Sequence, residues 1–201
     1  MKNRKGFTLI ELLAVIVILG VILAISIPRV SQYITNSRKG SFVSVASLFI
    51  DSVRHDATSE DYPMPVNNND VVIVTLDMAS LDKSKEKSAF GGKYLYGNSY
   101  VAIINTNNGT NPEYKYFVAL QDSKNYALPL TLETDVDTDK VVAHARNKME
   151  VTIQSLCGSE FGTVSSLANI SGLEKYQPVD ENGNRLNWNV TIFSTDKCGQ
   201  E

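Results

Sequence analysis

The apolar residues of this chain are concentrated at its N-terminus. Residues 12–25 contain no polar side chain, and the 21 residues from Phe7 to Ile27 include only three polar ones, Thr8, Glu11 and Ser26. A helix of this length rises about 30 Å, which matches the hydrocarbon core of a bilayer. The pattern therefore predicts a helix that spans a membrane.

Basic residues precede this helix, and three ordinary interpretations compete for it. Lys2, Arg4 and Lys5 predict a cytoplasmic N-terminus by the positive-inside rule. A secretory signal peptide would need a shorter apolar run and a small-residue cleavage site, which is not found. A buried core helix would need a polar face, which this apolar run does not have. The third interpretation is a plain single-span membrane anchor. None of these explains Glu11, since a carboxylate at the centre of a membrane helix costs about 2.5–3.5 kcal/mol, and less near the interface.

The pattern changes after Pro28, where apolar residues recur at helical spacing on one side only. We expect one long helix from about Phe7 to about His55, with Pro28 and Gly40 as weak points. A proline inside a helix predicts a kink or a melted turn. The apolar residues at this spacing are Ile34, Phe42, Val45, Phe49 and Val53. Residues 42–53 are expected to form the inner face, which packs on a sheet.

The remaining sequence alternates between short β-branched runs and turn residues, which predicts an α+β head. Pro129 would place its strand at a sheet edge. Helices are possible from Asp139 to Met149 and from Thr163 or Ser165 to Tyr176. The expected strands are 71–76, 99–105, 113–120, 126–133 and 185–195, and three or four of them should form an antiparallel sheet under residues 42–53.

Composition and charge exclude several classes of function. The 201 residues carry 19 Lys and Arg against 22 Asp and Glu, a net charge of −3, which argues against a protein whose main role is to bind nucleic acid. Two His, at 55 and 144, and two Cys leave few ligands for a transition metal. The G-x-S-x-G, Walker A and H-E-x-x-H motifs do not occur in the sequence. We expect no enzyme and no cofactor.

Two oxygen-rich segments resemble calcium loops only in part. Asp135, Asp137 and Asp139 have the opening spacing of an EF-hand, but Lys140 and Arg146 occupy the positions that require Gly and an acid. The segment 180–184 contains Asn-Gly, an ordinary hairpin signal. We interpret both as turns and expect no metal.

The segment Lys5-Gly6-Phe7-Thr8-Leu9-Ile10-Glu11, followed by the apolar run, resembles the class III signal of type IV pilins and related pseudopilins. The resemblance covers about residues 1–55. Gly20 and Pro28 fall where such helices commonly carry helix-weakening residues. The short leader and KGFTLIELLAVIVILGVILAISIP resemble Firmicute pilins, which suggests a Gram-positive cell.

The resemblance implies a processing pathway and a fold. A prepilin peptidase would cut between Gly6 and Phe7, and the new amine of Phe7 would be N-methylated. Removal of the leader takes the net charge from −3 to −6, the new amine aside. In the filament core, Glu11 of one subunit would neutralise the Phe7 amine of its neighbour, because a paired buried charge costs much less than an isolated one. The implied fold is the pilin fold.

The cysteines lie 41 residues apart, at Cys157 and Cys198. A head outside the cytoplasmic membrane lies where disulfides persist. Many pilins staple their C-terminal region in this way, and the resemblance therefore favours a Cys157–Cys198 disulfide over two free thiols. In the chain-entropy model, a loop of this length gives about 4 kcal/mol at most.

These expectations give a leader (1–6), a membrane and filament-core helix (7–28), its amphipathic continuation (29–56) and a head (57–201). The expected function is a major or minor subunit of a type IV pilus for adhesion, motility, biofilm formation or DNA uptake. The expected partners are other subunits, the peptidase, the assembly platform, the membrane, and a host surface or DNA. The chain would sit in the membrane before assembly and in a surface pilus afterwards. A secretion or competence pseudopilin and a membrane-anchored binding module that does not polymerise remain as alternatives.

Overall fold

The computed structural model describes residues 6, 8–59, 62–79, 87–107, 111–143 and 164–194. The chain forms two compact units, Met1–Arg38 and Lys39–Glu201. Helix α1 (Leu9–Thr58) contributes residues to both units. All strands belong to the second unit, and the two units are described in turn below.

The first unit consists of the N-terminal part of α1. The helical backbone continues through Gly20 and Pro28 without interruption, so the melted turn that the proline predicted does not occur within Leu9–Thr58. The expected long helix is confirmed, with its end at Thr58 rather than His55. The kink at Pro28 stays a prediction.

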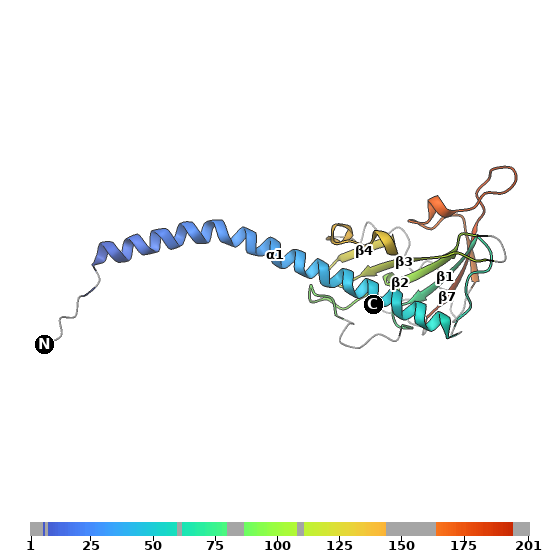
Figure 1. The fold of residues 1–201 in the computed structure, drawn as a ribbon, viewed down its shortest axis with the longest axis horizontal. Coiled ribbons are helices and arrows are strands. Elements are labelled where there is room, and N and C mark those ends of the chain that lie inside the picture. Colours follow the sequence, from blue (N-terminus) through green and yellow to red (C-terminus); the bar gives the residue numbers. More distant parts are fainter. Residues whose placement is uncertain are drawn as a thin grey trace. The chain divides into compact units, whose positions relative to one another are not determined.

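The second unit contains a sheet of seven strands in the order β5-β4-β3-β2-β1-β7-β6 (Figure 1). The expected antiparallel sheet of three or four strands is therefore too small. It is also wrong in one pairing, because β7 runs parallel to β1. The strands are β1 (Asp70–Thr75), β2 (Tyr100–Asn105), β3 (Tyr114–Gln121), β4 (Tyr126–Leu132), β5 (Val142–Ala143), β6 (Val164–Leu167) and β7 (Trp188–Phe193).

The C-terminal part of α1 covers one face of this sheet (Figure 1). Its buried residues pack with alternate residues of the central strands, such as Val72 and Val74 of β1. This burial confirms the inner helix face predicted for residues 42–53. The buried helix residues are Phe42, Val45, Ala46, Phe49, Ile50 and Val53.

The opposite sheet face carries a second core, which the sequence did not predict. Val71 and Ile73 of β1 point into it, together with Trp188 of β7. The segment that follows β6 covers it, with Ile170 and Leu173 fully buried. Both faces of β1 are thus buried, which explains its uninterrupted run of apolar residues.

Three local predictions need correction. Asp139 lies in a 3-10 turn (Thr138–Lys140) that leads into β5, so no helix starts there, and residues 144–149 lie outside the described part. The expected helix from Ser165 is strand β6, because its backbone pairs with β7, and only Glu174–Tyr176 form a 3-10 turn. Pro129 does not make β4 an edge strand; β5 pairs with Tyr126 and Ala127, and the proline lies beyond that pairing.

Candidate functional site

Helix α1 begins with a reciprocal cap between Thr8 and Glu11. Glu11 Oε2 accepts hydrogen bonds from Thr8 N at 2.8 Å and from Thr8 Oγ1 at 2.7 Å. In return, Glu11 N donates to Thr8 Oγ1 at 3.3 Å. This is the capping box, in which a Thr and a Glu three residues later satisfy free N–H groups of the first turn.

The capping box gives Glu11 a local partner that the sequence interpretation missed. The signal was present in the sequence, because Thr-x-x-Glu directly before an apolar run is a known start of a helix. A carboxylate near a helix N-terminus also interacts favourably with the helix dipole. These interactions therefore favour Glu11 at this position even in a single chain, without a neighbouring subunit.

The glycines assigned to this region are not required by packing. A Cβ placed on Gly6 or on Gly20 would meet no atom within 4 Å. Gly6 is exposed, and Phe7 lies outside the described residues. Any requirement for a small residue at Gly6 therefore has to come from a partner that binds this segment.

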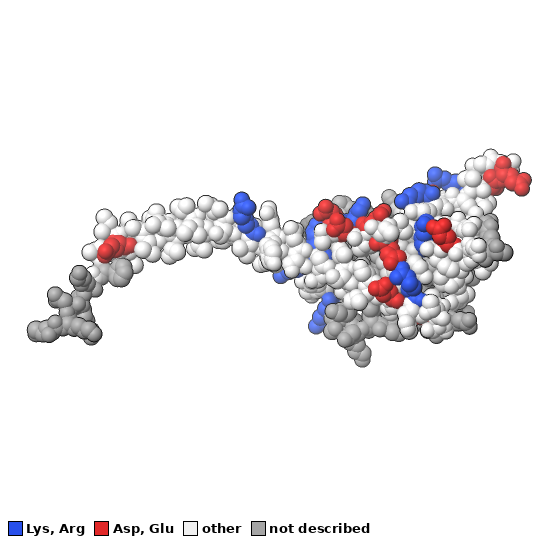
Figure 2. All heavy atoms as spheres, viewed as in Figure 1, with Lys and Arg blue, Asp and Glu red and all other residues white. Residues whose placement is uncertain are grey.

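The first part of α1 presents apolar side chains on all sides. Exposed fractions run from 83% at Leu9 to 48% at Val15, and Ile27 is still 63% exposed. Figure 2 shows this stretch as a continuous uncharged surface between the acidic residue near its start and the next basic residue. The helix is long and apolar enough to cross a membrane. Since water disfavours such a surface, a bilayer or other helices must cover it.

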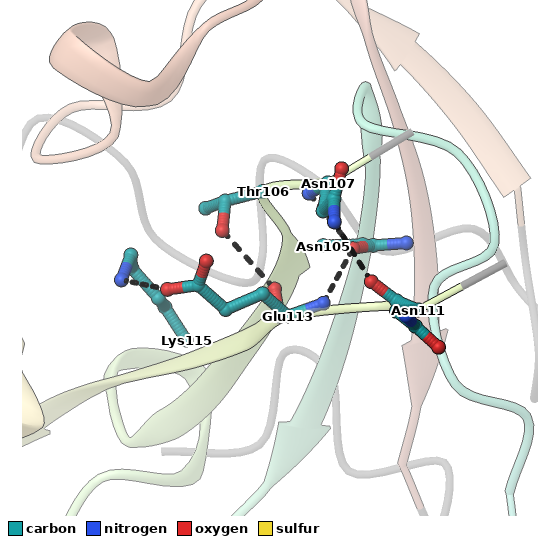
Figure 3. A network of polar contacts seen from close by, with 6 residues as sticks. All are labelled: Asn105, Thr106, Asn107, Asn111, Glu113 and Lys115. Atoms are coloured by element: carbon teal, nitrogen blue, oxygen red, sulfur yellow. Dashed lines mark hydrogen bonds and ion pairs between the residues drawn. The ribbon is translucent and has the colours of Figure 1, made fainter. Parts of the chain in front are cut away.

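In the head, a buried asparagine braces the turn between β2 and β3 (Figure 3). Asn105 is 2% exposed, and its Nδ2 donates to Val66 O at 2.9 Å. Its Oδ1 accepts from Asn107 N at 3.0 Å and from Glu113 N at 3.2 Å. One side chain thus fixes both sides of the turn and the loop before β1.

The two oxygen-rich segments are both turns, as interpreted from the sequence. Asp137 caps the 3-10 turn at Thr138, with its Oδ1 2.5 Å from Thr138 N. Asp180 Oδ1 accepts from Asn182 N at 2.9 Å and from Asn184 N at 2.8 Å, inside a hairpin. Gly183 adopts φ of 81°, the left-handed conformation that Asn-Gly turns need.

The two histidines and the two cysteines noted in the sequence differ in whether the structure describes them. Within the described ranges, His55 lies exposed in the last turn of α1, and its Nδ1 is 3.6 Å from Asp56 Oδ1. His144, Cys157 and Cys198 lie outside the described residues, so the disulfide stays a prediction.

Comparison with known proteins identifies the N-terminal segment. Residues 1–27 match the family model of the prokaryotic N-terminal methylation motif. No solved structure matches the chain. The match supports a structural protein of the type IV pilin-like prepilin class, with N-methylation and an N-terminal helix that anchors it in a membrane.

Proposed function

We propose that this chain is a major or minor pilin that polymerises through α1 into a surface type IV pilus. The observation that carries the proposal is the methylation motif at 1–27, which includes the first part of α1. The apolar surface of this part is uncovered and holds a single carboxylate, Glu11. A helix of this kind is soluble in a bilayer and equally suited to the core of a helical filament. The head (57–201) would face outward for adhesion, motility, biofilm formation or DNA uptake.

In this proposal, the peptidase cuts between Gly6 and Phe7, and the new amine of Phe7 is methylated. The amine is a cation at the start of an apolar helix. Coulomb attraction is much stronger in a low-dielectric core than in water, so a neighbouring Glu11 would pair with it. The pair stabilises one axial spacing between subunits, because at any other spacing both charges would be buried without a partner.

The test begins with filaments sheared from the surface of cells that produce the full chain. The expected subunit starts at methylated Phe7, which intact-mass and N-terminal peptide measurements show directly. An uncut chain that stays in the membrane as a monomer would contradict the proposal and favour a membrane-anchored binding module. Short assemblies confined to the envelope would favour a secretion or competence pseudopilin.

The second test removes the charge of Glu11. Glu11→Gln should leave membrane insertion unchanged and reduce filament yield by an order of magnitude or more, since an unpaired buried charge costs several kcal/mol. The matched control is Asp51→Asn, which removes a carboxylate from the exposed side of α1 in the head. Normal assembly of Glu11→Gln would contradict the proposed charge pair between Glu11 and the Phe7 amine.

A further inference from the structure

Asparagines gather at the end of the sheet where β1 and β7 begin. Asn67 and Asn69 precede β1, and Asn187 and Asn189 lie where β7 starts. The parallel pairing of the two strands places Asp70 opposite Asn189, which brings the four amides together. These four asparagines are called the asparagine rim below.

Hydrogen bonds hold the asparagine rim in place. The carboxylate of Asp70 accepts from Asn67 Nδ2 at 2.8 Å and from Asn189 Nδ2 at 3.3 Å, one on each oxygen. Asn69 Nδ2 donates to Asn187 O at 3.2 Å, and Asn189 N donates to Asn69 O at 2.8 Å. The amides are therefore ordered before a partner arrives, which lowers the entropy that binding costs.

The same hydrogen bonds determine which atom of each amide faces outward. Only the NH2 group of an asparagine can donate to a carboxylate, so the Nδ2 atoms of Asn67 and Asn189 point to Asp70. Both asparagines are exposed, which leaves their Oδ1 atoms for a donor from outside. The bond to the carboxylate also makes the oxygen of the same amide a stronger acceptor, because hydrogen bonds in a chain polarise one another.

An exposed valine lies beside these acceptors. Val66 directly precedes Asn67 and is 77% exposed, the largest fraction among the large apolar side chains of the head that the structure describes. Its carbonyl oxygen accepts from Nδ2 of the buried Asn105 at 2.9 Å, and Pro65 before it is buried. The backbone is thus fixed while the side chain stays in water, which disfavours apolar surface. A partner that covers Val66 would remove that cost.

The asparagine rim and Val66 suit the surface of an uncharged sugar chain. A sugar ring presents hydroxyl groups that donate hydrogen bonds and C–H groups that make apolar contacts. A metal ion is a poorer partner, because both oxygens of Asp70 already accept N–H groups, and no cluster of three acidic, His or Cys side chains occurs in the described part of the chain. A nucleic acid is also a poorer partner, because its phosphates need basic side chains, whereas this rim surrounds a carboxylate.

We propose that the asparagine rim and Val66 form a binding surface for neutral polysaccharide. The Oδ1 atoms of Asn67 and Asn189 accept from sugar hydroxyls, and Val66 contacts the C–H face of a ring. A few hydrogen bonds on an open surface give weak binding by one head, with a Kd of about 1 mM. In the filament of the proposed function, many heads would hold one polysaccharide together and raise the affinity through multivalency. Binding by a single head does not depend on polymerisation.

The test uses the full chain in a detergent without sugar groups, passed over columns of immobilised dextran, mannan and galactan. We expect the chain to be retarded on at least one of these uncharged polysaccharides, and the free polysaccharide of the same kind to abolish the effect. The retardation should persist in about 0.5 M salt, because no ion pair is involved. It should also persist in a chelator, and binding that requires calcium would overturn the proposal.

Two sets of variants test the residues themselves. Asn67→Ala and Asn189→Ala together should weaken binding about tenfold or more, because each change removes a hydrogen bond to the sugar. Val66→Thr keeps the branched shape and should weaken binding about threefold through the lost apolar contact. The matched control is Asn36→Ala, which removes an exposed amide of α1 outside the asparagine rim and should bind as the wild type does.

A further measurement uses the wild-type chain and does not depend on the folding of a variant. In ¹⁵N-labelled protein, the side-chain NH2 signals of Asn67 and Asn189 should shift on addition of the polysaccharide that retards the chain. The corresponding signal of Asn36 should not move. Unchanged signals of Asn67 and Asn189 in the presence of bound polysaccharide would place the sugar elsewhere and overturn the proposal.

The outcomes separate this inference from the proposed function. A chain that none of the three polysaccharides retards, or a double variant that binds as well as the wild type, overturns the sugar site and leaves filament assembly untouched. Self-association that the double variant loses, without sugar binding, would identify the asparagine rim as a contact between copies of this chain and also overturn the site. Sugar binding by a chain that forms no filaments in cells supports the site and contradicts the proposed function alone.

Discussion

Arg54 and Glu133 join the C-terminal part of α1 to the turn after β4, across 79 residues of sequence. Arg54 Nη2 lies 2.6 Å from both carboxylate oxygens of Glu133. The guanidinium also lies 4.7 Å from the centroid of the Tyr116 ring on β3. The hydrogen bond that Arg54 donates to the Glu133 carboxylate raises the pKa of Arg54 above its ordinary value.

Removal of this pair should cost modest stability. Both side chains are more than a third exposed, at 39% and 38%, so solvent screens the attraction. Arg54→Ala should lower the free energy of unfolding by about 1 kcal/mol, including the contact with Tyr116. Urea unfolding of the detergent-solubilised chain measures this loss. Lys115→Gln, which breaks an exposed pair within one strand, is the control, and an equal loss there would argue against a special role for Arg54.

The helix face on the sheet should be far more sensitive. Phe49 is fully buried, whereas its neighbour Leu48 is 44% exposed. Phe49→Ala should destabilise the head by about 3–5 kcal/mol through lost burial and a cavity. Leu48→Ala should change stability by about 0.5 kcal/mol or less. The single tryptophan, the fully buried Trp188, reports unfolding of both variants by its fluorescence. Equal losses would mean that residues 42–53 do not pack as described.

The contrast between Phe49 and Leu48 shows which parts of the fold local patterns can predict. The spacing of Phe42, Val45 and Phe49 requires only that one helix face be apolar, and it identified that face correctly. Strands β1 to β4 follow in the same way, because turns and β-branched runs lie within a few residues of each other. Local information therefore accounts for the helix and the first half of the sheet.

Long-range pairing accounts for what the sequence did not predict. The parallel contact of β7 with β1 joins residues such as Val190 and Val71, 119 positions apart. No window of sequence contains both strands, and a parallel pair needs a long crossover. The local sequence pattern predicts a helix where β6 lies for the same reason, since the strand that pairs with it, β7, lies beyond a hairpin. At the helix start, the charge of Glu11 does not by itself indicate the role of Thr8, because that role depends on the Thr-x-x-Glu spacing of a capping box.

The stability that the hairpin at Asp180 contributes should depend on pH, and the direction of this dependence follows from the pKa of Asp180. Hydrogen bonds from the backbone and side chain of Asn184 lower the pKa of Asp180 from its ordinary value of 3.8. Its contribution to stability is therefore complete above that value and is lost as the pH falls through the lowered pKa. Urea unfolding at a series of pH values measures it, in the wild type and in Asp180→Asn.

The free energies of unfolding of the wild type and of Asp180→Asn should differ most near neutral pH and converge in acid, because the variant has no charge to lose. The control is Glu181→Gln, which leaves the hydrogen bonds of Asp180 in place and should follow the wild-type profile. A constant difference between wild type and Asp180→Asn at all pH values would contradict the assignment.

Thr8 and Glu11 allow the local and the intersubunit roles of the carboxylate to be separated. A capping box accepts Gln in place of Glu, so Glu11→Gln keeps the cap and removes only the charge. Thr8→Ala does the reverse: it removes the hydroxyl contacts, at a cost of about 1 kcal/mol, and keeps the carboxylate. If Glu11 pairs with the Phe7 amine of a neighbour, filament yield should fall by an order of magnitude or more in Glu11→Gln and by about twofold or less in Thr8→Ala. The opposite order would show that the cap, rather than a charge pair between subunits, is what assembly requires.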